Sequence, residues 1–106
     1  MGARSDPRGQ LDLLLLSAVS SGPAHGYRVI ERLRERSEGA FDLREGTVYP
    51  ALHRLERDGL LESRWADDAP RRRRVYALTS RGRSALELKR REWSSFAGAV
   101  QAVIAG

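Results

Sequence analysis

The sequence predicts a mainly α-helical fold that contains one small β-hairpin and ends in a long helix. Apolar residues recur at helical spacing over residues 10–21, 24–37 and 45–58. Residues 60–78 instead alternate like two short strands, and the helical pattern returns from 79 to 104 without proline. A chain of 106 residues suits one compact core. We therefore expect a flexible arm at 1–9, a compact unit at 10–78 and a C-terminal helix at 79–106.

The first two predicted helices supply most of the core. Gln10 to Ser21 is so apolar that it has to be buried on most of its faces, and Gly22-Pro23 ends it with turn chemistry. The second helix, which leads from Ala24 to about Ser37, carries one apolar stripe and is capped by Gly39. The stripe consists of Val29, Ile30 and Leu33. Phe41 and Leu43, in the connector that follows, are expected to plug the core.

The third predicted helix separates a buried face from a polar one. Val48, Leu52 and Leu55 recur at the spacing of a core-facing stripe. Because proline is tolerated only in the first turn, Pro50 indicates that the helix starts near Glu45 to Thr47 or is kinked there. Asp42 and Glu45 have the spacing of a capping box. The outer face carries Gly46, Thr47, Tyr49, Pro50, His53, Arg54 and Arg57. This mixture of donors, flat rings and charge is typical of a helix in a DNA groove, and an ordinary solvated face is the alternative.

Two helices and a short connector before this helix form a helix-turn-helix arrangement. Leu60 to Ala66 and Arg72 to Leu78 read as strands around a turn at Asp67 to Arg71, and together they predict a wing. The predicted class is therefore a winged helix-turn-helix followed by a long C-terminal dimerisation helix.

The positive charge is concentrated at the wing. The formal net charge is +5, and all but one of the 19 basic residues are arginine, which binds phosphates and guanine edges in bidentate fashion. Residues 67–83 hold six arginines against two aspartates, and so carry four of the five net positive charges. This stripe favours a nucleic-acid partner, with a merely solvated surface as the alternative. On strand geometry, Arg72 and Arg74 share one face while Arg73 points to the other.

The C-terminal helix needs a partner. Thr79 or Ser80 caps it, and a 3-4 repeat follows. The repeat consists of Leu86, Trp93, Phe96, Val100 and Val103. A helix of about 25 residues is too long for the compact unit to cover. We expect this stripe to pack against the same helix of a second chain in a twofold homodimer.

The residue inventory argues against several other classes of protein. Without cysteine there is no disulfide, thiolate metal site or thiol nucleophile. His25 and His53 are the only histidines, and no third metal ligand or catalytic constellation accompanies them. We therefore expect no metal, no cofactor and no enzymatic activity. The longest apolar run, Leu13 to Leu16, is far too short for a membrane span or a signal peptide, so we expect no membrane partner and a cytoplasmic location.

Three motifs occur in order along the chain. Gly22-Pro23 precedes His25-Gly26-Tyr27, residues 45–60 read EGTVYPALHRLERDGL, and Tyr76-Ala77-Leu78-Thr79 follows an arginine cluster. From about Leu11 to Phe96 the sequence resembles the PadR family of winged-helix transcriptional repressors, in its short subgroup with a single C-terminal helix. The resemblance implies a dimeric repressor that binds an inverted-repeat operator and leaves DNA when a small molecule binds or changes in level. Phenolic acids and hydrophobic drugs act in this way on some members.

Two positions depart from the family pattern. Arg44 stands where relatives often carry Ser or Asn, so the usual helix cap is missing and Asp42 is its expected substitute. The wing tip, Asp67 to Pro70, lacks the glycine of many relatives, which leaves the geometry of the tip open.

The expected contacts with double-stranded operator DNA come from three places. The third helix is expected to read bases through Thr47, Tyr49, Pro50, His53 and Arg54, with Gly46 allowing close approach. The wing arginines Arg72, Arg73 and Arg74 are expected to bind the backbone or an adjacent minor groove, and Tyr27 and Arg28 to hold phosphates at the other edge. A core role for Tyr49 is one alternative. A winged-helix module that binds an acidic protein is another.

Trp93 has two interpretations. In the first it is an aromatic of the dimer core, because large aromatics commonly dominate such interfaces. In the second, which rests on the resemblance, the two copies of Trp93 sandwich a flat hydrophobic ligand, as in some short relatives. A small hydrophobic or aromatic effector then joins the expected partners.

Overall fold

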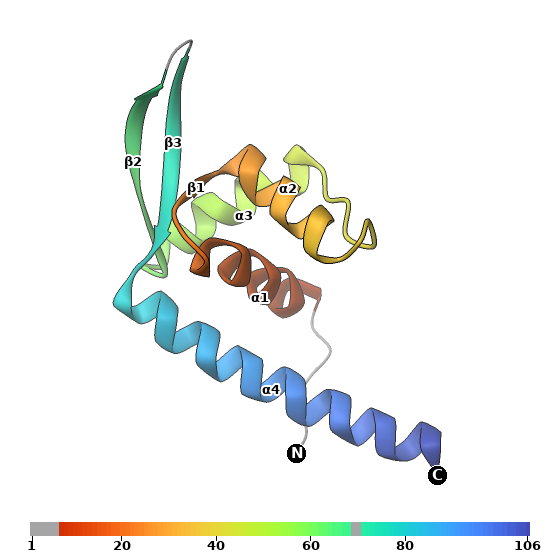
Figure 1. Ribbon diagram of the computed structural model, residues 1–106. Coiled ribbons are helices and arrows are strands. Elements are labelled where there is room, and N and C mark those ends of the chain that lie inside the picture. The colour runs from red at the N-terminus through yellow and green to blue at the C-terminus, as the bar shows by residue number, and fades with distance from the viewer. Residues whose placement is uncertain (1–6, 69–70) are drawn as a thin grey trace.

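In residues 7–68 and 71–106, which the computed structural model describes, four helices lie to one side of a three-stranded antiparallel sheet (Figure 1). The elements in chain order are α1 (Pro7–Ser20), β1 (Ala24–His25), α2 (Gly26–Arg36), α3 (Glu45–Arg57), β2 (Leu61–Asp68), β3 (Arg71–Leu78) and α4 (Ser80–Ala105). The predicted class, mainly α-helical with a β-hairpin wing and a long C-terminal helix, is confirmed.

The helix α1 lies at the centre of the core. Leu15, Leu16, Ala18 and Val19 are all at most 2% exposed, as the apolar composition of this helix requires. The helix begins at Pro7, so the expected flexible arm is wrong for residues 7–9. Proline suits a first helical turn because its fixed φ matches the helix and its missing N–H would have no partner there. The rest of the expected arm, residues 1–6, lies outside the described residues.

The short strand β1 is not evident from the sequence pattern. Ala24 pairs with Tyr76 and His25 with Val75, which gives the strand order β1-β3-β2. The helix α2 consequently starts at Gly26, with His25 as its N-cap. Two residues are too few to display an alternating pattern, so this pairing depends on the tertiary position of β3.

The connector between α2 and α3 differs from the prediction at two residues. Gly39, at φ 87°, donates its N–H to the carbonyl of Arg34 at 2.8 Å and closes α2 as expected. Leu43 packs against the core, but Phe41 is 44% exposed, so its predicted core role is wrong. The N-cap of α3 is Arg44 without any side-chain cap, and the predicted capping role of Asp42 is therefore also wrong.

The wing is a longer hairpin than predicted. Strands β2 and β3 pair from Leu61 opposite Leu78 out to Asp68 opposite Arg71, so both extend into the predicted turn. Tyr76 and Leu78 are buried at the inner end. The outer end projects beyond the helices (Figure 1).

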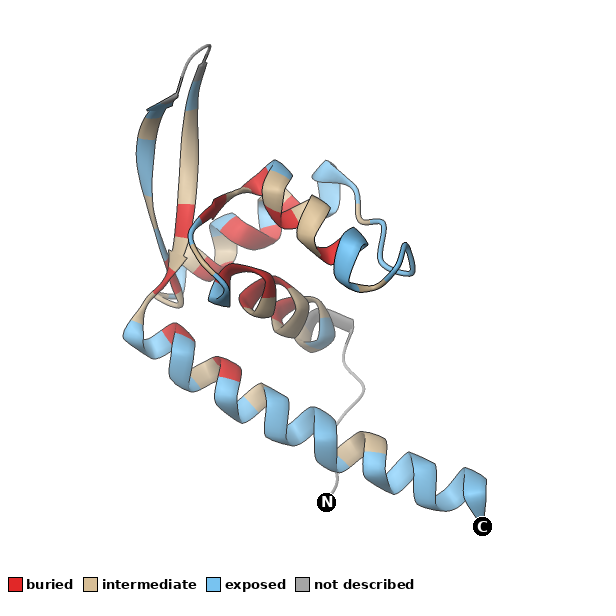
Figure 2. Cartoon of the chain, in the orientation of Figure 1, coloured by how far each residue is buried: buried red, intermediate tan, exposed pale blue. Residues whose placement is uncertain are grey.

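The helix α4 is seated directly on the wing. Thr79 is its N-cap: the hydroxyl accepts the N–H of Gly82 at 2.9 Å and donates to the carbonyl of Gly59 at 2.7 Å. At Gly82 a Cβ would lie 2.0 Å from the carbonyl oxygen of Leu60, so only glycine permits this approach. Leu86 is 3% exposed inside the chain's own core, which corrects its assignment to the dimer stripe. Beyond it, α4 extends into solvent (Figure 2).

Candidate nucleic-acid interface

The helix α3 presents one face that the core does not use. Val48, Leu52 and Leu55 are buried, while most of the residues predicted to face outward are exposed. The exposed residues are Gly46, Thr47, Pro50, His53 and Arg57. Pro50 lies inside the helix, and because it lacks an N–H the carbonyl of Gly46 loses its usual donor. A Cβ at Gly46 would meet no atom within 4 Å, so a ligand can approach the backbone closely at this end.

Tyr49 is partly a packing residue and partly a surface residue, which are the two alternatives that the sequence left open. Its side chain is half-buried, and a Cβ placed on Gly26 would lie 2.5 Å from its ring. Burial, and secondarily Glu45, raises the pKa of Tyr49 above its ordinary value. The ring therefore packs on the start of α2 while also facing the groove described next.

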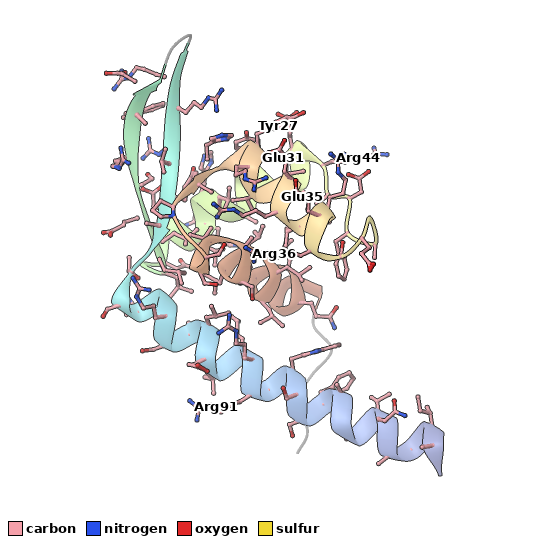
Figure 3. All side chains as sticks on the ribbon, in the orientation of Figure 1. Tyr27, Glu31, Glu35, Arg36, Arg44 and Arg91 are labelled. Carbon is pink, nitrogen blue, oxygen red and sulfur yellow. The ribbon has the colours of Figure 1, made fainter. Side chains whose placement is uncertain are left out.

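A groove with a volume of about 820 Å³ lies between the start of α2, the start of α3 and the wing. It is lined by His25, Gly26, Tyr27, Glu31, Glu45, Tyr49, Arg72, Arg73 and Arg74. Tyr27, which is 54% exposed, and Glu31 follow each other along α2 (Figure 3). The fold thus brings Tyr27, Tyr49 and the three wing arginines together from three separate stretches of sequence. Glu31 and Glu45 add negative charge to the same groove.

Arg54 does not belong to the exposed face. Its guanidinium forms a two-pronged ion pair with the Asp12 carboxylate, at 2.7 and 3.1 Å. The side chains of Arg54 and Asp12 are only 16% and 12% exposed. The hydrogen bonds to Asp12 raise the pKa of Arg54 further above its ordinary value. The predicted outward position of Arg54 is wrong, because this residue fastens α3 to α1.

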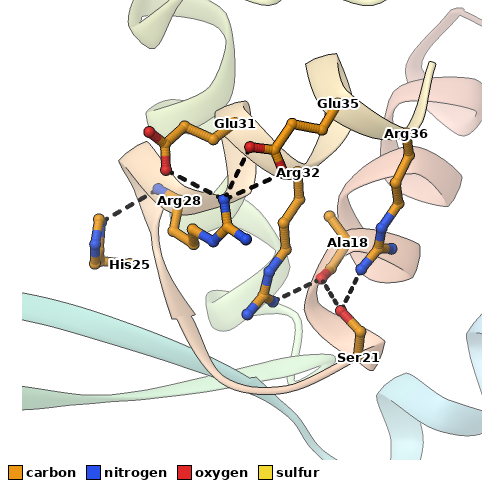
Figure 4. A network of polar contacts seen from close by, with 8 residues as sticks. All are labelled: Ala18, Ser21, His25, Arg28, Glu31, Arg32, Glu35 and Arg36. Atoms are coloured by element: carbon orange, nitrogen blue, oxygen red, sulfur yellow. Dashed lines mark hydrogen bonds and ion pairs between the residues drawn. The ribbon is translucent and has the colours of Figure 1, made fainter. Parts of the chain in front are cut away.

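Arg28 is also engaged within the chain. Its Nη1 lies 3.3 Å from Glu31 and 3.4 Å from Glu35, while its backbone N–H donates to Nδ1 of His25 at 3.2 Å (Figure 4). The expected phosphate contact would have to compete with two carboxylates for this guanidinium. Arg28 therefore links His25, Glu31 and Glu35 at the start of α2, and its phosphate contact stays a prediction.

Two further arginines of α2 hold it against the end of α1 (Figure 4). Arg32 donates to the carbonyls of Ala18 and Gly22 at 3.0 and 2.7 Å, and Arg36 donates to the hydroxyl of Ser21. Burial, followed by repulsion from Arg28, lowers the pKa of Arg32 below its ordinary value. The contacts of Arg32 give donors to carbonyls at and just beyond the C-terminal end of α1, where the helix itself supplies none.

The wing arginines divide between two faces as alternation predicts. Arg73 points toward β1, with its Nη1 2.8 Å from Nε2 of His25. The guanidiniums of Arg72 and Arg74 lie over the indole of Trp65, at 4.8 and 5.2 Å from the ring. The expectation that Arg72 and Arg74 share a face opposite Arg73 is confirmed.

Trp65 is the residue of this surface that the sequence analysis missed. It is 52% exposed and stands directly opposite Arg74 in the hairpin register. The available signal was that register, because a tryptophan across from an arginine repeat is placed for cation–π contact.

Two other expectations concern metals and membranes. No group of three or more His, Cys, Asp or Glu that could hold a metal occurs among the described residues. Within residues 7–68 and 71–106, no helix has both the length and the apolar character needed to cross a bilayer.

The fold and this basic groove define a winged helix-turn-helix protein. The sequence profile described as the transcriptional regulator PadR-like family matches residues 15–88. Transcriptional regulator Rv3488 of Mycobacterium tuberculosis is 39% identical over 88 residues, covering 83% of this chain and 79% of the relative. A crystal structure of a PadR family transcription regulator from Clostridium difficile is 35% identical with a TM-score of 0.76, and the match covers 91% of this chain and 98% of that one. A PadR family structure from Eggerthella lenta is 30% identical with a TM-score of 0.80, covering 92% and 83%.

The chain therefore belongs to the PadR-like family of transcriptional regulators. The relatives named above are transcriptional regulators rather than enzymes, so the prediction that this chain is not an enzyme is confirmed by its family.

Proposed function

We propose that this regulator binds double-stranded DNA sequence-specifically and represses transcription as a homodimer on an inverted-repeat operator. The observation that carries the proposal is the groove in which the start of α3, the start of α2 and the arginine-rich strand of the wing converge. Its dimensions and charge suit a DNA backbone lying between a helix in the major groove and a wing beside it.

In this proposal Thr47, Pro50 and His53 read base edges, and Gly46 admits the backbone of α3 close to the DNA. Tyr49 contributes the exposed edge of its ring. Phosphates are bound by Tyr27 on α2 and by the wing residues Arg72, Arg73 and Arg74. Arg28 and Arg54 are left out, because their guanidiniums are committed to carboxylates of this chain.

The proposed dimer uses the exposed half of α4. Trp93 is 47% exposed, Val100 40% and Val103 79%, and the Trp93 and Phe96 rings lie 6.0 Å apart. Ile104, at 71% exposure, extends the same stripe. Apolar side chains gathered on one helix face are stabilised by burial against a second copy. To bind half-sites one DNA turn apart, such a pair would have to hold its two copies of α3 about 34 Å apart.

The effector proposal concerns Trp93. Two copies facing each other across the twofold axis would offer flat apolar surfaces to a hydrophobic or aromatic molecule. Such a molecule would release the operator if it favours a dimer in which the two α3 helices have a different spacing.

DNA binding is tested by titrating labelled genomic fragments with protein at several salt concentrations. For six to ten phosphate contacts the affinity should fall by several orders of magnitude between about 50 and 200 mM salt. His53→Ala should weaken binding to the preferred fragment by about 1 to 3 kcal/mol and have less effect on random DNA. A protein that ignores duplex DNA at low salt would instead favour a protein-binding module.

The dimer and its effector are tested with Trp93→Ala and the matched control Leu88→Ala, which removes an exposed α4 side chain away from the stripe. We expect Trp93→Ala to keep DNA binding and to lose its response to flat aromatic compounds. In a Trp65→Phe background, tryptophan fluorescence reports on Trp93 alone. If Trp93→Ala becomes monomeric by light scattering and the fluorescence ignores a panel of such compounds, Trp93 is a packing residue only.

A further inference from the structure

The exposed indole of Trp65 lies outside the core and makes none of the DNA contacts proposed above. Leu61, Ser63, Trp65 and Asp67 lie on one face of β2, and the inner end of that face is buried against the helices. Trp65 lies beyond the covered region and is 52% exposed. Its neighbours there are two guanidiniums, Arg72 at 4.8 Å and Arg74 at 5.2 Å from the ring centroid. A cation within about 6 Å of an indole is attracted by the ring.

The three wing arginines differ in how many of their N–H donors are already bound by other residues of the chain. Arg74 donates from Nε to the hydroxyl of Ser63 at 2.8 Å and places Nη2 3.4 Å from Glu56. Arg73 has its Nη1 on His25 at 2.8 Å. Both side chains are therefore partly occupied within the chain.

Arg72 is the open one of the three. Its side chain is 64% exposed, and Nε lies 3.4 Å from Asp67. Neither of its η nitrogens has a hydrogen-bond partner in the part of the chain that the structure describes. Because the guanidinium lies over the indole, 4.8 Å from its centroid, the η N–H groups that point away from the ring remain available for a phosphate.

We infer that Trp65 is a positioning residue, which holds Arg72 against the wing so that its outer edge meets the DNA backbone. This inference rests on the proposed function. Arg74, which is held by Ser63 and Glu56, makes the second cation–π contact with the indole and so helps to fix the ring. The ion pair with Asp67 limits the rotation of Arg72. A free arginine loses much rotamer freedom when it binds, and an arginine already held on a ring loses less. Arg72 is consequently the main phosphate contact of the wing.

The test is a double-mutant cycle read by fluorescence anisotropy with a labelled random-sequence duplex. Trp65→Leu should weaken binding roughly two- to fivefold, as expected for an exposed cation–π contact, and Trp65→Phe should retain most of the affinity. Arg72→Gln should lower the salt slope by about one. In the Arg72→Gln background, Trp65→Leu should cause no further loss, because its effect passes through Arg72.

Arg64→Gln is the matched control. It removes a charge from the same strand at an exposed position on the opposite face, so its effect should simply add to that of Trp65→Leu. Far-UV circular dichroism checks that each variant is folded, and Trp65→Thr replaces Trp65→Leu if that variant is not. An unchanged affinity in folded Trp65→Leu, or an equal loss with and without Arg72, overturns the role of Trp65 alone. A wild-type protein that binds no duplex at about 50 mM salt overturns the proposed DNA binding as well.

Discussion

Replacing Arg54 with alanine should lower the stability of the folded protein and leave its preference among DNA sequences unchanged. The substitution leaves the Asp12 carboxylate, 12% exposed at its side chain, without the two hydrogen bonds at 2.7 and 3.1 Å that now satisfy it. Removing one partner of such a buried pair costs about 3 kcal/mol. For a domain of this size that loss corresponds to a melting temperature lower by about 10 to 20 °C.

The assay combines thermal unfolding by circular dichroism with DNA binding at a temperature where the variant is folded. Folded Arg54→Ala should keep the wild-type ratio of affinities for a preferred genomic fragment and for random DNA. Replacing both partners, as Asp12→Leu with Arg54→Met, should recover most of the stability, because no uncompensated charge then remains. Wild-type stability in Arg54→Ala together with a lost preference for the specific fragment would refute this reasoning and return Arg54 to the DNA-reading surface.

Three other outcomes follow from individual contacts. Gly26→Ala should push the Tyr49 ring aside, which destabilises the fold by about 1 to 2 kcal/mol in urea titrations and weakens DNA binding. Gly98→Ala, on the open side of α4, is the control and should do neither. Equal effects of the two substitutions would contradict the contact between Gly26 and Tyr49. Burial raises the pKa of Tyr76 in the folded state. The free energy of unfolding that this shift contributes is present below the ordinary tyrosine pKa of about 10 and is lost as the pH rises through the folded-state pKa. Tyr76→Phe should therefore flatten the fall in stability at alkaline pH, measured by unfolding at a series of pH values. An unaltered alkaline limb would mean that other groups cause it. Thr79→Ala removes the N-cap of α4 and should lower the free energy of unfolding by about 1 kcal/mol in thermal melts. An unchanged melting temperature would mean that the cap does not stabilise the fold.

The helices were predictable because their signals are local. Val48, Leu52 and Leu55 repeat along a short stretch, and Thr79 caps α4 through a residue three positions away. The strand β1 depends on pairing with β3, about fifty residues later in the chain, and it has no local pattern of its own. Phe41 shows the limit of hydrophobicity as a guide, since an apolar residue in a connector can remain exposed when the core is already filled.

The same distinction applies to the site. The division of Arg72 and Arg74 from Arg73 was predictable, because side chains alternate along any strand. The outward position assigned to Arg54 failed because its partner, Asp12, lies 42 residues earlier, and no helical pattern reveals such a pair. The phosphate contact of Arg28 stays a prediction, and the carboxylates of Glu31 and Glu35 that hold its Nη1 were evident on the same helix.

The close contact of Gly82 with Leu60 joins α4 rigidly to the rest of the fold. A helix of 26 residues, rising about 1.5 Å per residue, is about 39 Å long, and it is anchored by bare backbone against the end of the wing. The side chain of Leu78 also lies 3.1 Å from a Cβ built at Gly82, so the start of α4 has little room to rotate. A tilt of α4 would therefore be carried into the winged unit, including α3, which ends at Arg57, three residues before Leu60. Movement of the exposed end of the helix is, in this geometry, transmitted to the winged unit rather than absorbed where the two meet.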